Sequence, residues 1–117
     1  MNKREIGNLF EDIACKHLIE LGYLILERNF HASKIGEIDI IAIKDGQLYF
    51  VEVKGRRSVR FGAPAESVSP RKIQKIKLTA SYYLTRYDYH NLEINFFILE
   101  ILQSGEAYDI NIISDIF

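Results

Sequence analysis

Apolar residues recur every three or four positions near the start of the chain, as they do on one face of an amphipathic helix. The recurrence predicts a helix over residues 5–21, and Gly22 follows it as a typical C-terminal stop. One histidine falls among the apolar positions without breaking their spacing. The stripe comprises Ile6, Leu9, Phe10, Ile13, His17 and Leu21.

The pattern then changes to short apolar runs, which are typical of β-strands. Two of these runs flank Asp45-Gly46, a residue pair that strongly favours a two-residue type I′ hairpin turn. We therefore expect the two strands to pair antiparallel across this turn, and we expect a loop over residues 31–36. The three predicted strands cover residues 23–30, 37–43 and 48–54.

A second helix is predicted to begin at Ser69-Pro70, because serine caps a helix N-terminus and proline fits the first turn. Residues 55–68 before it form a predicted loop. The helix carries an apolar stripe of Ile73, Ile76, Ala80, Tyr83, Leu84 and Tyr87. Two more strands are predicted over residues 93–101 and 107–113. The order helix, three strands, helix, two strands predicts an α/β fold with a mixed central sheet flanked by helices.

Length and composition bound the class of protein. The chain has 117 residues, of which 48% are hydrophobic and 26% are charged, and this balance predicts one globular domain spanning residues 1–117. No apolar run approaches the roughly 18 residues that a membrane-spanning helix needs, so we expect a soluble, cytoplasmic protein. Cys15 is the single cysteine, which excludes an internal disulfide and a multi-cysteine zinc site.

The net charge of −1 conceals an uneven distribution of charge along the chain. Residues 54–77 contain eight basic residues and one acid, whereas residues 88–117 contain six acids and neither lysine nor arginine. A positive segment of this kind suits contacts with nucleic-acid phosphates, and a solvated charged surface is the alternative interpretation. The residues that we expect to contact DNA phosphates are Arg56, Arg57, Arg60, Arg71, Lys72 and Lys75.

The predicted hairpin also sets a register for its charged residues. Counting outward from the turn places Asp39 opposite Glu52, and Glu37 opposite Lys54. Directly opposite side chains share one face of a sheet, with Cβ atoms about 5 Å apart. Two carboxylates this close within apolar runs repel each other unless a cation compensates, and Mg²⁺ or Mn²⁺ suits such oxygen ligands. Alternatively, the charges of the Glu-Val-Lys tripeptide point to solvent.

Several short motifs, taken together, resemble a known group of enzymes. The motifs are Glu11-Asp12-Ile13-Ala14, Arg28-Asn29-Phe30, Gly36-Glu37-Ile38-Asp39-Ile40-Ile41-Ala42, Phe50-Val51-Glu52-Val53-Lys54 and Phe61-Gly62-Ala63-Pro64-Ala65-Glu66. Over nearly its whole length, the chain resembles the PD-(D/E)xK nuclease superfamily and, more closely, the bacterial YraN family of endonuclease-like proteins. This resemblance implies a restriction-endonuclease-like fold and a kinship with archaeal Holliday-junction resolvases.

The resemblance also implies roles for individual residues. Asp39 and Glu52 would be ligands of Mg²⁺ or Mn²⁺, and Lys54 would be the catalytic lysine. Glu11, on the first helix, would approach the same site as an additional acid and metal ligand, and Glu37 is a secondary candidate.

Four positions depart from the pattern of the family, and one of them is Phe97, which stands where relatives often carry aspartate. Ile38 stands at the position where the PD-(D/E)xK motif has its proline. Phe10 replaces the glycine that usually precedes the helix glutamate, and Gly55 replaces the small polar residue that usually follows the lysine. We expect Phe10 to affect how its neighbour Glu11 packs.

Two kinds of function follow from these residues. The first is a metal-dependent DNA endonuclease, acting on branched or damaged DNA, and a two-fold homodimer would suit cleavage of both strands. The second is a catalytically silent DNA-binding module, or an adaptor in DNA repair or recombination, built on a nuclease fold. The intact set of Asp39, Glu52 and Lys54 favours the enzyme.

Overall fold

The helices and strands follow one another in the predicted order. The computed structural model describes residues 2–57, 68–89 and 91–117. Its elements are α1 (Lys3–Glu20), β1 (Leu24–Ala32), β2 (Gly36–Lys44), β3 (Gln47–Arg56), α2 (Pro70–Arg86), β4 (Glu93–Ser104) and β5 (Ala107–Ile113). Element ends lie within a few residues of the predicted ones, but the loop predicted over residues 31–36 is shorter, because β1 and β2 extend into it.

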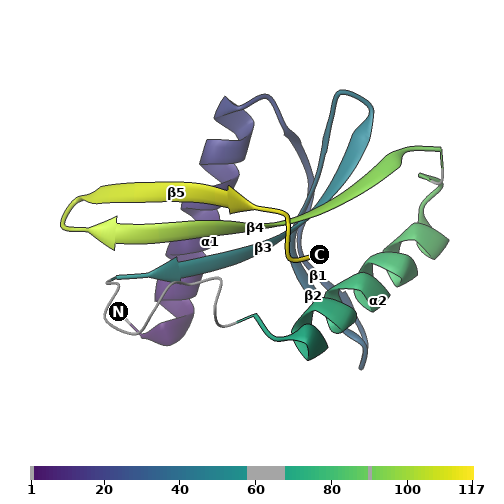
Figure 1. Cartoon of the computed structure of the whole chain (residues 1–117), viewed down its shortest axis with the longest axis horizontal. Helices are drawn as coiled ribbons and strands as arrows, with labels where there is room; N and C mark the ends of the chain where they lie inside the picture. The colour runs from purple at the N-terminus through teal and green to yellow at the C-terminus, as the bar shows by residue number, and fades with distance from the viewer. Residues whose placement is uncertain (1, 58–67, 90) are drawn as a thin grey trace.

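The strands form one mixed sheet in the order β1-β2-β3-β4-β5 (Figure 1). Neighbouring strands are antiparallel except β3 and β4, which run parallel. Parallel neighbours need a crossover connection, and α2 lies in the connection between them. The prediction of a mixed α/β sheet flanked by helices is therefore confirmed. No helix in the described part of the chain is long and apolar enough to cross a bilayer.

The β2–β3 hairpin has the predicted turn. Asp45 and Gly46 have φ angles of 51° and 72°, and a type I′ turn needs positive φ at both central residues. Pairing then runs from Lys44 opposite Gln47 to Ile40 opposite Val51, in the predicted register. The register is thus confirmed up to this last pair.

Each face of the sheet carries its own hydrophobic core, covered by one helix (Figure 1). The core under α1 joins residues of the helix to β2, β3 and β4. The core under α2 joins Ile76, Ala80 and Tyr83 to apolar residues of the three N-terminal strands, including Phe30 and Phe50. The apolar stripe predicted for the second helix therefore faces the sheet at Ile76, Ala80, Tyr83 and Leu84, but not at Tyr87, which follows the helix and is 39% exposed.

The stripe predicted for the first helix is partly wrong. The residues of α1 that are buried against the sheet are Phe10, Ala14, Cys15 and Leu18. Leu21 is 44% exposed, and Leu9 is only half-buried and lies outside the core. The small side chains of Ala14 and Cys15 let the helix approach the sheet closely. The face of α1 that is buried is therefore the one that packs best on the sheet, and not the one with the most large apolar residues.

Two of the departures from the family pattern compensate each other. A Cβ atom added at Gly55 would overlap the ring of Phe10. The ring is 4% exposed and belongs to the core under α1. The large residue on the helix thus occupies space that the glycine of β3 leaves free, and the contact holds the N-terminal half of α1 against the end of β3.

Replacing Gly55 with alanine is expected to lower the free energy of unfolding by about 1–3 kcal/mol, the usual cost of overfilling a packed core. Urea denaturation of the two proteins measures the difference. Gly7→Ala is the matched control, because a Cβ there meets nothing within 4 Å, and alanine in an exposed helix is more stable than glycine by about 1 kcal/mol. Unchanged stability of Gly55→Ala would mean that the Phe10 ring moves freely aside.

Candidate active site

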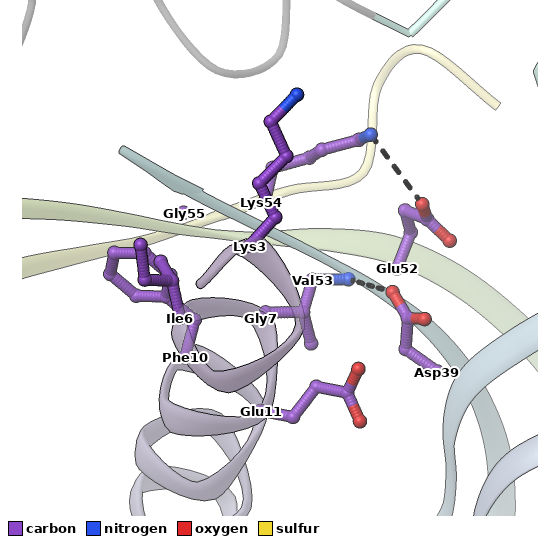
Figure 2. Close-up of a pocket in the computed structure, with 10 residues that line it drawn as sticks. All are labelled: Lys3, Ile6, Gly7, Phe10, Glu11, Asp39, Glu52, Val53, Lys54 and Gly55. Carbon is purple, nitrogen blue, oxygen red and sulfur yellow. Dashed lines mark hydrogen bonds and ion pairs between the residues drawn. The ribbon is translucent and has the colours of Figure 1, made fainter. Parts of the chain in front are cut away.

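A cavity of about 370 Å³ lies between the N-terminal half of α1 and the second half of β3. It is lined by four residues that the sequence predicts for the site: Glu11, Asp39, Glu52 and Lys54 (Figure 2). The same cavity is lined by Lys3 of α1 and by the Phe10–Gly55 contact. The predicted acids and the predicted lysine thus come from one helix and two strands to one place.

Asp39 occupies the point where β2 separates from β3. Backbone pairing of the two strands ends at Ile40 and Val51, so Asp39 and Glu52 are not the backbone pair that the sequence predicts. Instead, the Asp39 carboxylate accepts a hydrogen bond of 2.8 Å from the Val53 N–H (Figure 2). The side chain thereby takes a place on β3 that a backbone carbonyl of β2 would otherwise fill, and it meets the carboxyl group of Glu52 there.

The β1–β2 ribbon turns over at this same point. Ile40 belongs to the core under α1, whereas Ile38, two residues away, belongs to the core under α2. Residues two apart in a regular strand share a face, so the alternation breaks at Asp39. On β1, Asn29 lies opposite, between the pairs Arg28–Ile40 and Phe30–Ile38, and its φ of 52° is left-handed. Asparagine tolerates that conformation better than most residues.

Glu52 is a buried acid held between two lysines. The residue is 5% exposed, and its Oε1 atom lies 3.8 Å from the Lys54 Nζ and 3.6 Å from the Lys72 Nζ. Burial, followed by the nearby charge of Asp39, raises the pKa of Glu52 to about 7. Burial also raises the pKa of Asp39, against the opposing effect of the Val53 N–H. Two neighbouring carboxyl groups at this position therefore resist being charged together.

Glu11 is the third acid of the cavity. Its side chain extends from α1 toward Asp39 (Figure 2), and burial, then the charge of Asp39, raises its pKa. The Asn29 side chain donates a hydrogen bond to the carboxylate, and the Arg28 guanidinium lies 3.8 Å from Oε1. Among the described residues, that Oε1 atom has no hydrogen-bond partner although it is buried. A buried acceptor without a partner carries a desolvation cost that a bound cation would offset.

The donor set matches the chemistry of a hard divalent cation. Asp39, Glu52 and Glu11 all line the cavity and offer carboxylate oxygens, which suit Mg²⁺ and Mn²⁺ better than softer metals. In the part of the chain that the structure describes, however, no group of three or more such side chains is close enough to share one ion without rearrangement.

The secondary candidate, Glu37, has a different partner from the one predicted. Its Oε2 atom lies 3.0 Å from the Nε2 atom of His31 on β1, and the two residues pair across the β1–β2 ladder. The prediction that Glu37 faces Lys54 is wrong, because β2 has left β3 two residues earlier. Glu37 acts on the site through its charge, which raises the pKa of Asp39.

The predicted DNA-contacting residues lie on two elements. Arg56 ends β3, directly beyond Lys54, and Arg57 follows it. Arg71 and Lys75 are exposed on the first turns of α2. Arg60 lies outside the described residues. The basic residues therefore flank the cavity from the β3 side and from the α2 side.

The contacts that three residues make with the acids of the site were not predicted from the sequence. The contact of Lys72 with Glu52 comes from α2, some twenty positions further along the chain. Arg28, which also bonds Asp12 at 2.9 Å, and Asn29 hold Glu11 from β1. The motif Arg28-Asn29-Phe30 is part of the resemblance to the family and could have indicated these two residues, but the sequence analysis assigned them no function.

Comparison with other sequences places the chain among bacterial relatives. Residues 10–101 match the family described as "Uncharacterised protein family UPF0102". A UPF0102 protein of Caldicellulosiruptor saccharolyticus is 42% identical over 119 aligned residues, covering 100% of both chains. A UPF0102 protein of Syntrophomonas wolfei is 45% identical, over 97% of this chain and 98% of its own. The protein with the carboxylate-lined cavity thus belongs to the UPF0102 family, the YraN-like family that its motifs resemble.

Proposed function

We propose that this protein is a metal-dependent DNA endonuclease of the PD-(D/E)xK superfamily, with a restriction-endonuclease-like fold. One observation carries the proposal: the buried carboxyl group of Glu52 and the half-buried carboxyl group of Asp39 meet in a cavity that Glu11 and Lys54 also line. Bringing two carboxyl groups together where both lose much of their contact with water costs free energy. Binding of a cation for phosphodiester chemistry is the function that best explains this cost.

Each residue has a distinct task in the proposed reaction. Asp39 and Glu52 would bind the metal directly, and Glu11 would bind it through water or after a small movement of α1. When bound, Mg²⁺ or Mn²⁺ lowers the pKa of a coordinated water and neutralises charge on the phosphate. Lys54, at the rim of the cavity beside Glu52, would donate hydrogen bonds to the attacking water or to the phosphoryl oxygens.

DNA is the substrate that we propose, with branched or damaged DNA as the favoured form. The basic residues on both sides of the cavity would neutralise backbone phosphates, which is a sequence-independent mode of binding. A homodimer related by a two-fold axis would present two such cavities to the two strands of a duplex.

The proposal predicts that the protein nicks or cleaves DNA when Mg²⁺ or Mn²⁺ is added, and not in EDTA. Agarose gel analysis of supercoiled plasmid measures this. Asp39→Asn should lose the activity because it removes a negative ligand without changing size. Asp109→Asn, an exposed substitution on β5, is the matched control and should cut like the wild type. Equal cutting by Asp39→Asn would overturn the assignment of Asp39.

Metal binding is tested separately by calorimetric titration with Mn²⁺ at pH 6. Because the raised pKa of Glu52, about 7, leaves this group largely protonated at pH 6, binding should release a proton. The measured heat should therefore depend on the ionisation enthalpy of the buffer. At pH 8.5 this dependence should vanish and the affinity should rise. Asp39→Asn should bind Mn²⁺ at least about tenfold more weakly, because even the loss of a residue that only supports a metal ligand lowers metal affinity by about this factor.

A catalytically silent DNA-binding module is the second candidate. Lys54 and Lys72 already lie against Glu52, so their ammonium groups provide part of the compensation that a cation would provide. This candidate predicts DNA affinity that falls steeply with salt but does not need a divalent cation. Binding of DNA without cleavage at any Mg²⁺ or Mn²⁺ concentration would favour it over the nuclease.

A further inference from the structure

A second cavity, of about 300 Å³, lies on the α2 side of the proposed active site. It is formed by the β1–β2 turn and the first turns of α2. Three lysines line it: Lys34 of the turn, and Lys72 and Lys75 of the helix. The Lys72 Nζ also lies 3.6 Å from the Oε1 atom of Glu52, which lines the first cavity, so this lysine connects the second cavity to an acid of the first.

The charges of this second cavity do not balance. Among the described residues that line it, Glu37 is the one acid, against three lysines, and its Oε2 atom lies 3.0 Å from the His31 Nε2. Lys72 is shared with Glu52. Among residues 2–57, 68–89 and 91–117, Lys34 and Lys75 have no carboxylate partner. The lysines that line this hollow therefore outnumber its acid, and the excess of positive charge favours an anion.

The walls of this cavity are held in place by tight contacts. The Ile35 N–H donates to the Ala32 carbonyl at 2.7 Å, which closes the β1–β2 turn. A Cβ atom added at Gly36 would overlap the Oγ1 atom of Thr79, and that hydroxyl donates a 2.7 Å hydrogen bond to the Lys75 carbonyl. The turn that carries Lys34 is thus packed directly on the segment of α2 that carries Lys75.

We propose that this second cavity binds a backbone phosphate of the substrate strand, adjacent to the phosphate that is cut. The proposal rests on the proposed function for the identity of the substrate. A strand whose scissile phosphate lies over Glu52 and Lys54 would pass Lys72, and its neighbouring phosphate would reach Lys34 and Lys75. Lys34 and the β1–β2 turn thereby become part of the DNA-binding surface, which the basic segment of the sequence does not include.

The first experiment compares two double variants with the same change in net charge. Lys34→Ala/Lys75→Ala removes the unpaired lysines of the cavity, whereas the control Lys16→Ala/Lys77→Ala removes exposed lysines elsewhere on the two helices. Binding of a short fluorescein-labelled duplex is followed by anisotropy, with Ca²⁺ in place of Mg²⁺. The cavity variant should bind about tenfold more weakly, with a salt dependence reduced by up to about two counterions. The control should stay within about twofold of the wild type. Equal losses in the two variants overturn the proposal.

The second experiment locates the phosphate. The phosphates of one strand are replaced singly by uncharged methylphosphonates. At one position the neutral linkage should weaken binding by the wild type but not by Lys34→Ala/Lys75→Ala. If every position weakens both proteins equally, the cavity does not hold a strand phosphate. Stabilisation of the wild type by inorganic phosphate without such a position would point to a free anion instead, and would also overturn the proposal.

These measurements separate the two proposals. If the wild type shows the position-specific effect but does not cut DNA with Mg²⁺ or Mn²⁺, the second cavity is a binding site for a DNA phosphate and the endonuclease proposal fails. If the wild type cuts DNA and the cavity variant binds like the control, the endonuclease stands and the subsite fails. Absence of any DNA binding by the wild type overturns the subsite.

Discussion

Replacement of Lys54 with alanine is expected to slow DNA cleavage by about 10²–10³-fold, the usual cost of removing one donor that stabilises charge in the transition state. The Nζ atom of Lys54 lies 3.8 Å from Glu52 Oε1 at the cavity that the three acids line. Because the acids remain, Mn²⁺ affinity should change little. Single-turnover cleavage with protein in excess, together with Mn²⁺ calorimetry, separates the two effects.

Lys72→Ala is the informative comparison for this experiment. Its ammonium group lies 3.6 Å from the same carboxylate oxygen and comes from α2 rather than β3. If Lys72→Ala slows cleavage and Lys54→Ala does not, the catalytic lysine is the one on α2 and the assignment of Lys54 from the motif is wrong. Lys16→Ala, on the exposed side of α1, controls for loss of a positive charge.

Glu52→Gln is expected to stabilise the metal-free protein while it abolishes cleavage. The pKa of Glu52 is raised from 4.5 to about 7 in the folded chain, so the folded state holds a proton that the unfolded state releases between these values. The free energy of unfolding of the wild type therefore falls as the pH rises from about 4.5 to about 7. A shift of this size corresponds to roughly 3 kcal/mol of destabilisation at neutral and alkaline pH.

Thermal unfolding in EDTA at a series of pH values measures this effect. The variant and the wild type should melt together below about pH 4.5, and the variant should melt several degrees higher above about pH 7. Glu106→Gln, an exposed substitution in the β4–β5 turn, is the control and should not move the midpoint. An equal stability of Glu52→Gln and the wild type at pH 8 would show that the ionised carboxyl group of Glu52 does not destabilise the folded protein.

Addition of Mg²⁺ or Mn²⁺ provides a second test of whether the buried carboxyl group of Glu52 destabilises the metal-free protein. A ligand that binds only the folded state raises its stability by mass action, so the cation should raise the melting midpoint of the wild type much more than that of Glu52→Gln. The gap between the two proteins should therefore close as metal is added. Stability given up at a site and regained on ligand binding is a common mark of functional residues.

The local features of the fold could be predicted from the sequence because they depend on neighbouring residues. Asp45 and Gly46 form the predicted turn because both adopt positive φ angles. Ser69 caps α2 by accepting a hydrogen bond from the Lys72 N–H, and Pro70 occupies the first turn, as predicted. Counting outward from this turn gave the correct hairpin register over the pairs nearest to it.

The site required tertiary information, because its key contacts join segments that are distant in sequence or break a regular pattern. The predicted Asp39–Glu52 ladder pair does not form; the carboxyl groups meet because β2 leaves β3 and Asp39 turns to accept the Val53 N–H. Lys72 reaches Glu52 only because the crossover helix lies on that face of the sheet.

The chain by itself thus determined which chemical groups are present, the order of the helices and strands, and the turn that brings two acidic strands together. The tertiary structure decided where pairing stops, which face each side chain takes and which lysines lie beside the acids. The physical reason is range: turn and cap preferences are set by bonded neighbours, whereas the meeting of Asp39, Glu52 and Glu11 depends on how two helices pack on opposite faces of one twisted sheet.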